Sequence, residues 1–374
     1  MAATPTSTRT WILANRPKGT PTFASTDANP TFKLVERPLP PLQPNQVLVK
    51  TLFFSNDPAQ RPAIDASVKA ERHYTPPVEI GAPMMARGLA EVVESTADNL
   101  PKGTIVAVAP GWTEYAVVDA ADASPRQPLP GGLSITHYLG AFGGPGLTAY
   151  YGLVVIGEAK KGMRVVVSGA AGATGSMVVQ IAKNIVGCSE VIGIAGSDEK
   201  CRWVESLGAD KCINYKSPTF EEDLNKATDG FVDIYFDNVG GVTEPAVAEQ
   251  HETNDTVMIQ GHILDLMLAR LKRYGVSVAC GSITSYNSME PTVLQNYFQV
   301  ITMRLSIRGF IVSDYLPKAQ ETIQLFVQAI KDGKLKITNE ESEQVVDTKF
   351  EDVPKTWLKL FEGGNTGKLV TKLV

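Results

Sequence analysis

The stretch SGAAGATGSMVVQIAKNIVG, residues Ser168–Gly187, decides the fold of this chain. An apolar run, Val165–Val167, precedes it, glycines crowd the turn, and a segment of helical period follows. This order predicts the strand, turn and helix of a dinucleotide site, in which Gly172 and Gly175 let the backbone approach a pyrophosphate and the helix N-terminus offers N–H groups to it. The run reads AxGxxG or GxxGxxG rather than GxGxxG, so a glycine-rich turn without a ligand stays an open alternative.

The second predicted strand indicates which dinucleotide would bind. Val191–Ala195 forms this strand, which ends in Gly196 and Ser197 and is followed by Lys200. Sites that prefer NAD usually carry an acidic residue there, bonded to the ribose 2′-hydroxyl. Because a small residue and a cation accept a 2′-phosphate that a carboxylate would repel, the pattern favours NADPH. A solvated lysine in the first turn of a helix is the alternative for Lys200.

Length and composition bound the class of protein. A chain of 374 residues predicts two domains, and 43% hydrophobic with 20% charged residues is typical of a globular protein. The net charge of −5 gives no reason to expect a nucleic acid or an acidic membrane surface as partner. No apolar run is long enough to span a bilayer, and the first residues lack the pattern of a signal peptide. The four cysteines have no paired spacing, which favours a reducing compartment, so we expect a cytoplasmic protein.

The pattern of apolar residues divides the chain into three parts. Up to about residue 135 it predicts short strands broken by proline and glycine, and from about 149 to 306 strands alternate with helical segments. After an amphipathic helix at 318–335, strand patterns return at 342–350 and 368–374. The prediction is an α/β chain with a β-rich domain built from residues 1–140 and 323–374, into which a doubly wound parallel-sheet domain at 141–322 is inserted.

Several short motifs together carry a resemblance to a known family. They are SNDPAQR (55–61), YTPPVEIGAPM (74–84), GPGLTAYYGL (144–153), SGAAGATGS (168–176), GSDEK (196–200), NYK (214–216), FDNVGG (236–241), CGSITSYN (280–287) and GGNTGK (363–368). In this order and spacing the chain resembles the medium-chain dehydrogenase/reductase superfamily, and within it the zinc-independent alkenal/one reductases of the prostaglandin reductase type. The resemblance implies a GroES-like β-rich domain, a Rossmann domain that binds NADPH, and a homodimer.

The resemblance also implies roles for individual residues. The pyrophosphate would be cradled by Gly172, Ala173, Thr174 and Gly175, and the adenosine 2′-phosphate held by Lys200 and Tyr215. Asn238 would line the cofactor groove, and a loop beside the nicotinamide would comprise Cys280, Gly281, Ser282, Ile283, Thr284, Ser285 and Tyr286. Backbone groups of Phe310, Ile311 and Val312 would contact the carboxamide, and Asn365 would close over the cofactor. Packing or turn roles remain the alternatives for Tyr215, Asn238 and Asn365.

The residues before position 140 argue against the zinc chemistry of the superfamily. A catalytic zinc needs three protein ligands from Cys, His or carboxylate side chains. This segment has no cysteine, and its histidines, His73 and His137, have no partner at ligand spacing. We therefore expect surface or capping roles for both histidines and no metal.

Without a Lewis acid, conjugate reduction is easier than reduction of an isolated carbonyl, because negative charge collects on an enolate oxygen. We therefore predict NADPH-dependent reduction of the C=C bond of an α,β-unsaturated aldehyde or ketone. Tyr286 is the first candidate for the hydrogen-bond donor to that oxygen, and Tyr74 the second. A ribose hydroxyl or a water could donate instead, and both tyrosines could be rim residues of the pocket.

Two departures from the family pattern affect these predictions. Ala59 and Gln60 replace the usual aromatic residue and methionine in SxDPxxR, which changes the substrate pocket, and Asp57 and Arg61 are expected to form a structural ion pair. Nineteen residues, 242–260, then follow NVGG where the family has almost none. We expect a loose excursion, which is either a lineage-specific loop or a translated intron.

Other functions fit the same pattern. A quinone reductase or a pathway-specific enoyl reductase of the same superfamily would share the dinucleotide site. A protein of another class, one that binds NADPH without catalysis, would combine an intact glycine-rich turn with a changed substrate loop.

Overall fold

The computed structural model describes residues 4–23, 28–65, 70–241, 255–288 and 293–374. The chain divides into two compact units: unit 1 comprises Met1–Leu139 and Glu343–Val374, and unit 2 comprises Gly140–Ser342. None of the helices in the described ranges combines the length and apolar character needed to cross a membrane.

Unit 1 is built around a mostly antiparallel sheet in the order β14-β15-β3-β4-β5-β7, with β6 paired to β3 and a separate pair β1-β2. Its strands are β1 (Ser7–Leu13), β2 (Phe32–Pro38), β3 (Gln46–Ser55), β4 (Gly88–Ser95), β5 (Ile105–Val108), β6 (Tyr115–Asp119), β7 (Ser124–Pro125), β14 (Glu343–Thr348) and β15 (Lys368–Leu373). Helix α8 (Val353–Leu358) also belongs to this unit. Because β15 pairs with β3, the end of the chain completes the sheet that the beginning starts.

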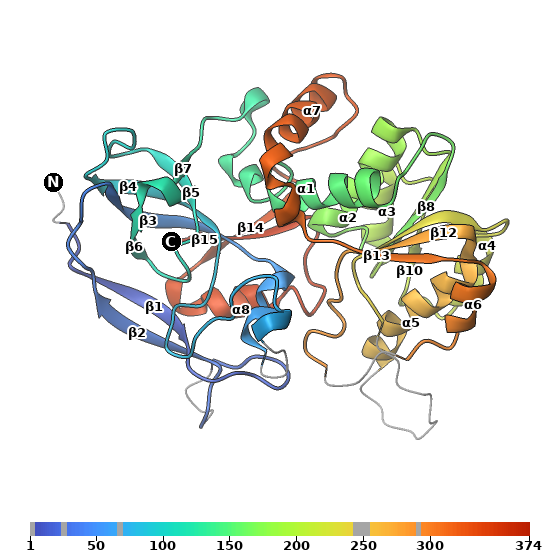
Figure 1. The fold of residues 1–374 in the computed structure, drawn as a ribbon, viewed down its shortest axis with the longest axis horizontal. Helices are drawn as coiled ribbons and strands as arrows, with labels where there is room; N and C mark the ends of the chain where they lie inside the picture. The colour runs from blue at the N-terminus through green and yellow to red at the C-terminus, as the bar shows by residue number, and fades with distance from the viewer. Residues whose placement is uncertain (1–3, 24–27, 66–69, 242–254, 289–292) are drawn as a thin grey trace. The chain divides into compact units, whose positions relative to one another are not determined.

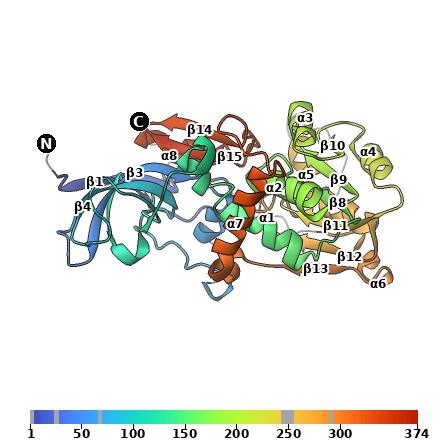
Figure 2. The same cartoon turned by 90° about the horizontal axis from the view of Figure 1, so that it is seen from above.

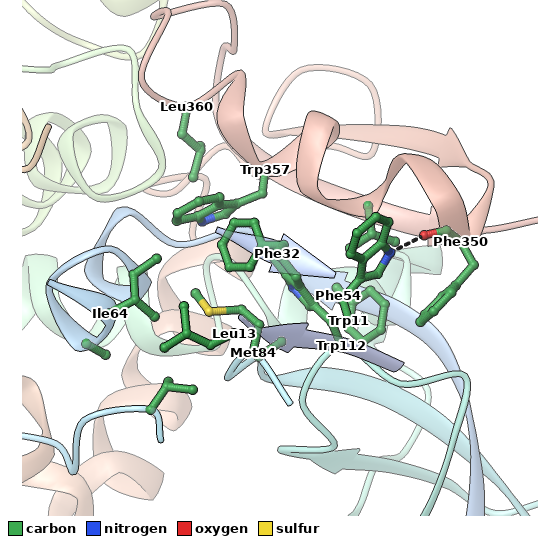
Figure 3. Packing of buried hydrophobic residues seen from close by; sticks show 14 of the residues in the cluster. Trp11, Leu13, Phe32, Phe54, Ile64, Met84, Trp112, Phe350, Trp357 and Leu360 are labelled. Carbon is green, nitrogen blue, oxygen red and sulfur yellow. Dashed lines mark hydrogen bonds between the residues drawn. The ribbon is translucent and has the colours of Figure 1, made fainter. Parts of the chain in front are cut away.

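Aromatic side chains from both ends of the chain form the core of unit 1 (Figure 3). Phe32 packs edge-on against Trp112 at 5.0 Å and against Trp357 at 6.0 Å between ring centroids. The indole N–H of Trp11 donates to the carbonyl of Phe350 at 2.8 Å. Burial of such large apolar surfaces is the main stabilisation available to a β-rich unit, and here it needs both chain segments.

Unit 2 holds a parallel six-stranded sheet in the order β10-β9-β8-β11-β12-β13. The strands are β8 (Arg164–Val167), β9 (Glu190–Ala195), β10 (Lys211–Asn214), β11 (Val232–Asp237), β12 (Leu271–Ala279) and β13 (Ser306–Gly309). The helices are α1 (Gly144–Tyr150), α2 (Ala173–Gln180), α3 (Asp198–Ser206), α4 (Phe220–Ala227), α5 (Asp255–Arg270), α6 (Tyr297–Thr302) and α7 (Ala319–Lys331). Figure 1 shows α2 and α3 on one side of this sheet and α5 on the other. This strand order is the doubly wound order that binds dinucleotides, so the predicted fold class is confirmed.

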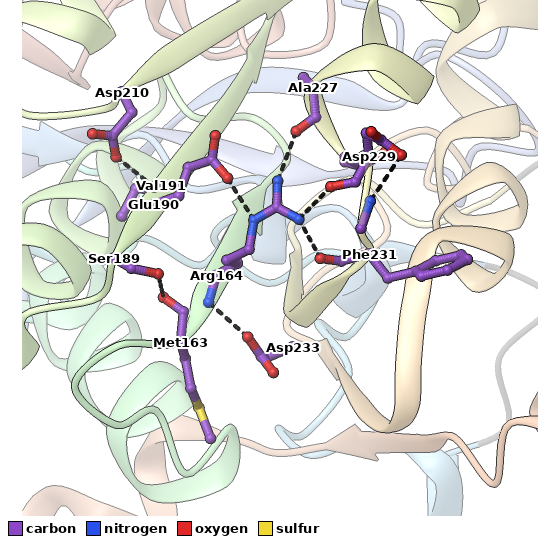
Figure 4. A network of polar contacts seen from close by, with 12 residues as sticks. Met163, Arg164, Ser189, Glu190, Val191, Asp210, Ala227, Asp229, Phe231 and Asp233 are labelled. Carbon is purple, nitrogen blue, oxygen red and sulfur yellow. Dashed lines mark hydrogen bonds and ion pairs between the residues drawn. The ribbon is translucent and has the colours of Figure 1, made fainter.

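A polar network holds the amino-terminal edge of this sheet together (Figure 4). The backbone N–H of Arg164 donates to Asp233 at 2.7 Å, and its guanidinium donates to Glu190 and to the carbonyl groups of Ala227, Asp229 and Phe231. The network therefore fixes β8 between β9 and β11, and the opposite ends of these strands carry the candidate site.

Two boundaries differ from the sequence prediction. The return to the β-rich unit was expected at residue 323, but residues up to Ser342 group with unit 2. Helix α7 explains this, because Thr322 bonds to Tyr151 at 2.8 Å and Phe326 packs on Tyr150. The expected excursion at 242–260 lies mostly outside the described residues, but α5 already begins at Asp255, so its last six residues are helical rather than loose.

Candidate functional site

The glycine-rich turn follows β8, where the strand order of the sheet reverses. Gly172 is the residue before the first turn of α2, with no side chain to cap that turn. A Cβ atom on Gly175 would lie 2.2 Å from the carbonyl oxygen of Gly169, so α2 and the turn approach each other as only glycine allows. Ala173 and Thr174 lie in the same first turn, which places all four predicted residues at one helix N-terminus.

The end of β9 gathers the residues predicted to hold a 2′-phosphate. The Ser197 hydroxyl caps α3 by accepting from the N–H of Lys200 at 3.2 Å. A Cβ on Gly196 would lie 2.9 Å from the hydroxyl of Tyr215, so this ring covers the glycine. The ammonium of Lys216 lies 5.9 Å from the centre of the same ring.

Two cations, Lys200 and Lys216, lie near this strand end, beside Asp198 and Glu199 in the first turn of α3. Burial lowers the pKa of Lys200, and the nearby Lys216 ammonium lowers it further, whereas Glu199 raises it. The repulsion between two ammonium groups is relieved when a phosphate lies between them. Lys216 was not among the predicted residues, although it ends the NYK motif; its role depends on β10 lying beside β9, which the motif alone does not show.

A buried carboxylate, Asp237, organises the next two loops. Its Oδ1 accepts from the hydroxyls of Tyr235 and Ser168 and from the N–H groups of Val239 and Gly240, at 2.9–3.2 Å. Burial raises the pKa of Asp237, and these four donors oppose the rise. Asp237 was not among the predicted site residues; the signal for it in the sequence is an acidic residue at the end of a buried strand in FDNVGG.

Asn238 lies between the glycine-rich turn and this carboxylate. Its side-chain amide donates to the carbonyl of Ser168 at 2.7 Å, and its backbone N–H donates to the Ser168 hydroxyl at 3.0 Å. The end of β11 is therefore tied to the end of β8, which brings Asn238 beside the turn; its role in lining a cofactor groove stays a prediction. Both strand ends meet at the carboxyl edge of the sheet, where ligands bind in such folds.

The loop after β12 packs on the same strand end. The backbone N–H groups of Cys280 and Gly281 donate to the carbonyl of Asp237 at 2.9 and 3.1 Å. The Thr284 hydroxyl donates to the carbonyl of Val239 at 2.7 Å, and a Cβ on Gly240, whose φ is +76°, would collide with the Ser282 hydroxyl at 2.1 Å. The predicted 280–286 loop is thus held against NVGG.

This loop carries two kinds of side chain that could take part in a reaction: hydroxyl groups and the thiol of Cys280. Ser282 and Ser285 share a hydrogen bond of 2.7 Å between their hydroxyls, and the Tyr286 hydroxyl accepts from the N–H of Ser282 at 3.4 Å. Burial and the neighbouring Asp237 raise the pKa of Cys280 to about 12. Its thiol is therefore neutral at physiological pH, and Cys280 is a packing residue rather than a nucleophile.

The predicted carboxamide contacts follow β13. Phe310, Ile311 and Val312 are all half-buried. A Cβ on Gly152 would meet the Phe310 ring at 2.6 Å and the Phe236 ring at 2.7 Å. The Phe310 side chain therefore packs inside unit 2, which leaves its backbone as the part available for a ligand.

In unit 1, the SNDPAQR loop is held by an ion pair between a buried lysine and a half-buried aspartate, which the sequence did not predict. Lys368 lies 2.6 Å from Asp57 and donates to the carbonyl of Asn56 at 2.7 Å. The expected pair of Asp57 with Arg61 is wrong: Arg61 is paired with Asp65 at 2.8 Å. One short 3-10 turn, Pro58–Gln60, lies between the two residues of the expected pair, and a second, Pro62–Ile64, lies between Arg61 and its actual partner Asp65.

Tyr74 and Asn365 also lie in unit 1. The Tyr74 side chain is exposed, and its hydroxyl lies 3.4 Å from the carbonyl of Ala59. Burial of the hydroxyl and the nearby Asp57 charge raise its pKa, so the phenol stays protonated at neutral pH. The Asn365 amide donates to the carbonyl of Gly367 at 2.9 Å within the GGNTGK motif.

The histidines differ from the expectation. His137 is fully buried, with Nδ1 3.0 Å from Oε1 of buried Glu343, so the expected surface role is wrong. His73 is half-buried in a loop. In the described part of the chain, no three His, Cys, Asp or Glu side chains are grouped so that they could hold a metal ion.

The chain is similar to known proteins in sequence and in structure. The model of the family described as "N-terminal domain of oxidoreductase" matches residues 9–125, and that described as "Zinc-binding dehydrogenase" matches residues 173–332. Prostaglandin reductase 1 of Mus musculus is 35% identical over 369 residues, covering 97% of this chain and 98% of that protein. The NADPH-dependent curcumin reductase of Escherichia coli is 32% identical over 375 residues, covering 98% and 96%. The crystal structure of CurA from Vibrio vulnificus in complex with NADPH matches with a TM-score of 0.81 at 31% identity, covering 98% of this chain and 99% of that one.

Proposed function

The chain belongs to the zinc-independent enone reductases of the medium-chain dehydrogenase/reductase superfamily, and we propose that it reduces the C=C bond of α,β-unsaturated aldehydes and ketones with NADPH. The observation that carries this proposal is the close approach of α2 to the turn at Gly169, together with the cations Lys200 and Lys216 that follow the neighbouring strands β9 and β10. The first feature suits a pyrophosphate and the second a 2′-phosphate.

The residues present fit this cofactor. Backbone N–H groups of Ala173, Thr174 and Gly175 would hold the pyrophosphate, and Lys200, Tyr215 and Lys216 the 2′-phosphate. The 280–286 loop and the backbone of Phe310–Val312 would position the nicotinamide. When bound, NADPH supplies a hydride to the β-carbon of the substrate. Every other task falls to the protein, which must orient the substrate and stabilise charge on its oxygen.

Tyr286 is the residue we propose as hydrogen-bond donor to that oxygen. A phenol can accept one hydrogen bond while it donates another. Because the Tyr286 hydroxyl accepts from the N–H of Ser282, the hydroxyl is positioned and its own proton stays available for the substrate oxygen. The bonds between this loop and the Asp237 strand end hold the ring in place. Tyr74 is the second candidate, and its raised pKa keeps it a neutral donor. Asn365 is proposed to close over the cofactor.

The test is NADPH consumption with a medium-chain 2-alkenal, with identification of the product. A saturated aldehyde as product, with no turnover of a saturated ketone run in parallel, is the expected result. Tyr286→Phe is expected to lower kcat about 10²-fold, because it removes a donor to the developing oxyanion. Reduction of a simple quinone in preference to the alkenal would favour a quinone reductase, and NADPH binding without turnover would favour a non-catalytic protein.

The cations at the end of β9 should set the coenzyme preference. Lys200→Ala and Lys216→Ala are each expected to raise the Kd for NADPH about 10- to 100-fold, because each removes a charged hydrogen bond to the 2′-phosphate. The Kd for NADH should change little. Titration of each nucleotide by fluorescence measures both, with Lys226→Ala, an exposed lysine of α4, as the matched control. Equal losses for NADPH and NADH would contradict this assignment.

The homodimer is proposed to form at the free edge of the unit 2 sheet. Strand β13 ends the strand order, as Figure 2 shows, and its Ile307 is exposed. On α6, Phe298 and Ile301 are 67% and 61% exposed. A second copy would cover these apolar side chains and pair the open edge.

Sedimentation equilibrium tests the dimer. The variant with Phe298→Asp and Ile301→Asp is expected to be a monomer at micromolar concentration, whereas Val345→Asp, an exposed position of unit 1, should remain a dimer. A dimer that persists in the first variant would locate the interface elsewhere.

We propose that the enzyme acts in the cytoplasm. All four cysteines, Cys188, Cys201, Cys212 and Cys280, are free thiols, which supports a reducing compartment. Fractionation of cells that express a tagged chain would test this proposal, and recovery of the protein with secreted material would contradict it.

A further inference from the structure

Asp237 holds a buried negative charge at the carboxyl end of β11. The side chain is 2% exposed, and its Oδ1 accepts hydrogen bonds from the hydroxyls of Tyr235 and Ser168 and from the backbone N–H groups of Val239 and Gly240. Hydrogen bonds of this kind stabilise the ionised form of a carboxyl group. Because these donors are neutral, they satisfy the oxygen atom but leave its negative charge uncompensated.

No cation balances this carboxylate among the residues that the structure describes. Each ion pair within those ranges uses another acidic side chain. The pair on the same strand, Asp233 with Lys272 at 3.1 Å, lies near the opposite end of β11. The field of Asp237 therefore acts on its surroundings without local neutralisation, and burial together with this charge raises the pKa values of Tyr235 and Cys280.

The charge lies next to the loop that is proposed to hold the nicotinamide. The backbone carbonyl of Asp237 accepts from the N–H of Cys280 at 2.9 Å. The carboxylate accepts from the N–H of Gly240 at 2.9 Å, and a Cβ on Gly240 would lie 2.1 Å from the Ser282 hydroxyl. The 280–286 loop is therefore bonded to the residue that carries the charge, and it also packs on the turn that the carboxylate holds.

We propose that the Asp237 carboxylate tunes the bound coenzyme toward its oxidised form, NADP+, and so promotes release of the hydride. This inference rests on the proposed function for the identity of the coenzyme and for the place of its nicotinamide. The ring is neutral in NADPH and carries one positive charge in NADP+. An uncompensated anion nearby stabilises that positive charge, both in the product and as it develops in the transition state.

The charges of the reaction agree with this role. The substrate gains the hydride, with its electron pair, at the β-carbon, and its π electrons move to the carbonyl oxygen. A proton from solvent then adds at the α-carbon and gives the saturated product. The coenzyme loses the same electron pair and becomes cationic, so a carboxylate on its side of the reaction lowers the cost of the transfer.

The ratio of the Kd for NADP+ to the Kd for NADPH tests the proposal without turnover. Both nucleotides carry the same phosphates, so contacts to these groups cancel in the ratio. Asp237→Asn removes the charge and keeps the shape of the side chain. It is expected to raise the ratio about tenfold, which is the effect of a unit charge about 12 Å away at an effective dielectric constant of about 20. The potential of the bound couple should rise correspondingly by about 30 mV.

Two further variants complete the titration experiment. Asp233→Asn is the matched control, because it removes a carboxylate near the other end of the same strand, and its ratio should stay within about twofold of that of the unsubstituted protein. If Asp237→Asn does not fold, Asp237→Ser replaces it, since a serine hydroxyl can accept the turn bonds from Val239 and Gly240. A merely structural role for Asp237 would raise both Kd values by the same factor. An unchanged ratio in the neutral variant would therefore overturn the proposal.

Failure of the proposed function gives a different result. If the unsubstituted protein binds both nucleotides but reduces no enone, the proposed function fails, and the ratio still tests the role of Asp237. If enones are reduced and the ratio is the same in Asp237→Asn, only the role of Asp237 is overturned.

Discussion

Gly175→Ala is expected to unfold the cofactor site and to destabilise unit 2. The added Cβ would lie 2.2 Å from the Gly169 carbonyl oxygen and 2.8 Å from the Cα of Ala170. Both atoms belong to the backbone, so no side-chain rotation relieves the clash. Overpacking of this kind costs about 1–3 kcal/mol, and separating α2 from the turn should also raise the Kd for NADPH about a hundredfold. Differential scanning calorimetry and nucleotide titration measure the two effects.

Gly172→Ala is the matched control at the same turn. Its Cβ would lie 3.2 Å from the same oxygen, and its φ of −84° suits any residue. The melting temperature should therefore shift by no more than about 2 °C. The methyl group would nevertheless lie where the pyrophosphate approaches, so the Kd for NADPH should still rise about tenfold. Similar melting temperatures for both alanine variants would contradict the close approach at Gly175.

Local patterns predicted most of the fold. Short strands were expected up to about residue 135, and β3 and β4 lie there, because apolar runs between turn residues determine such strands. Helix α7 was also expected, but its assignment to a domain was not, since it depends on Tyr151 and other residues far away in sequence. The start of α5 at Asp255 was missed because its first turns show no clear apolar face.

The candidate site also combines features that local sequence indicates with features that depend on contacts far apart in the sequence. Motifs located Gly175, Lys200 and the 280–286 loop, because each motif is a continuous stretch with its own turn chemistry. They did not reveal that Asp237 accepts hydrogen bonds from several segments, or that Lys216 lies near Lys200. Both arrangements depend on which strands are neighbours in the sheet. An ion pair between Asp57 and Arg61 was expected within one motif, whereas the actual partner of Asp57, Lys368, comes from strand β15.

Lys368→Met is expected to have the largest effect on unit 1. The lysine is 3% exposed, and its loss leaves the Asp57 carboxylate without its ammonium partner and the carbonyl of Asn56 without a donor. Breaking a fully buried pair by removing one partner costs about 3–5 kcal/mol, and because the Asp57 side chain is 28% exposed the loss here should be about 3 kcal/mol or less. Urea unfolding followed by tryptophan fluorescence measures this loss, because three of the four tryptophans, Trp11, Trp112 and Trp357, lie in the core of unit 1.

The pH dependence of that loss distinguishes the ion pair from simple packing. Burial alone would raise the pKa of Asp57, but attraction to Lys368 and hydrogen bonds from Lys368 and Ser55 bring it below the ordinary value. The pair therefore stabilises the fold fully above the unfolded pKa of about 3.9, and this stabilisation is lost as the pH falls through the lower folded pKa. In Lys368→Met, burial dominates and protonation of Asp57 relieves the buried charge, so the difference between the two proteins should shrink below about pH 5. Adding Asp57→Asn to Lys368→Met should restore part of the stability at neutral pH. If the difference in stability between the unsubstituted protein and Lys368→Met did not change with pH, the lysine would act only by packing.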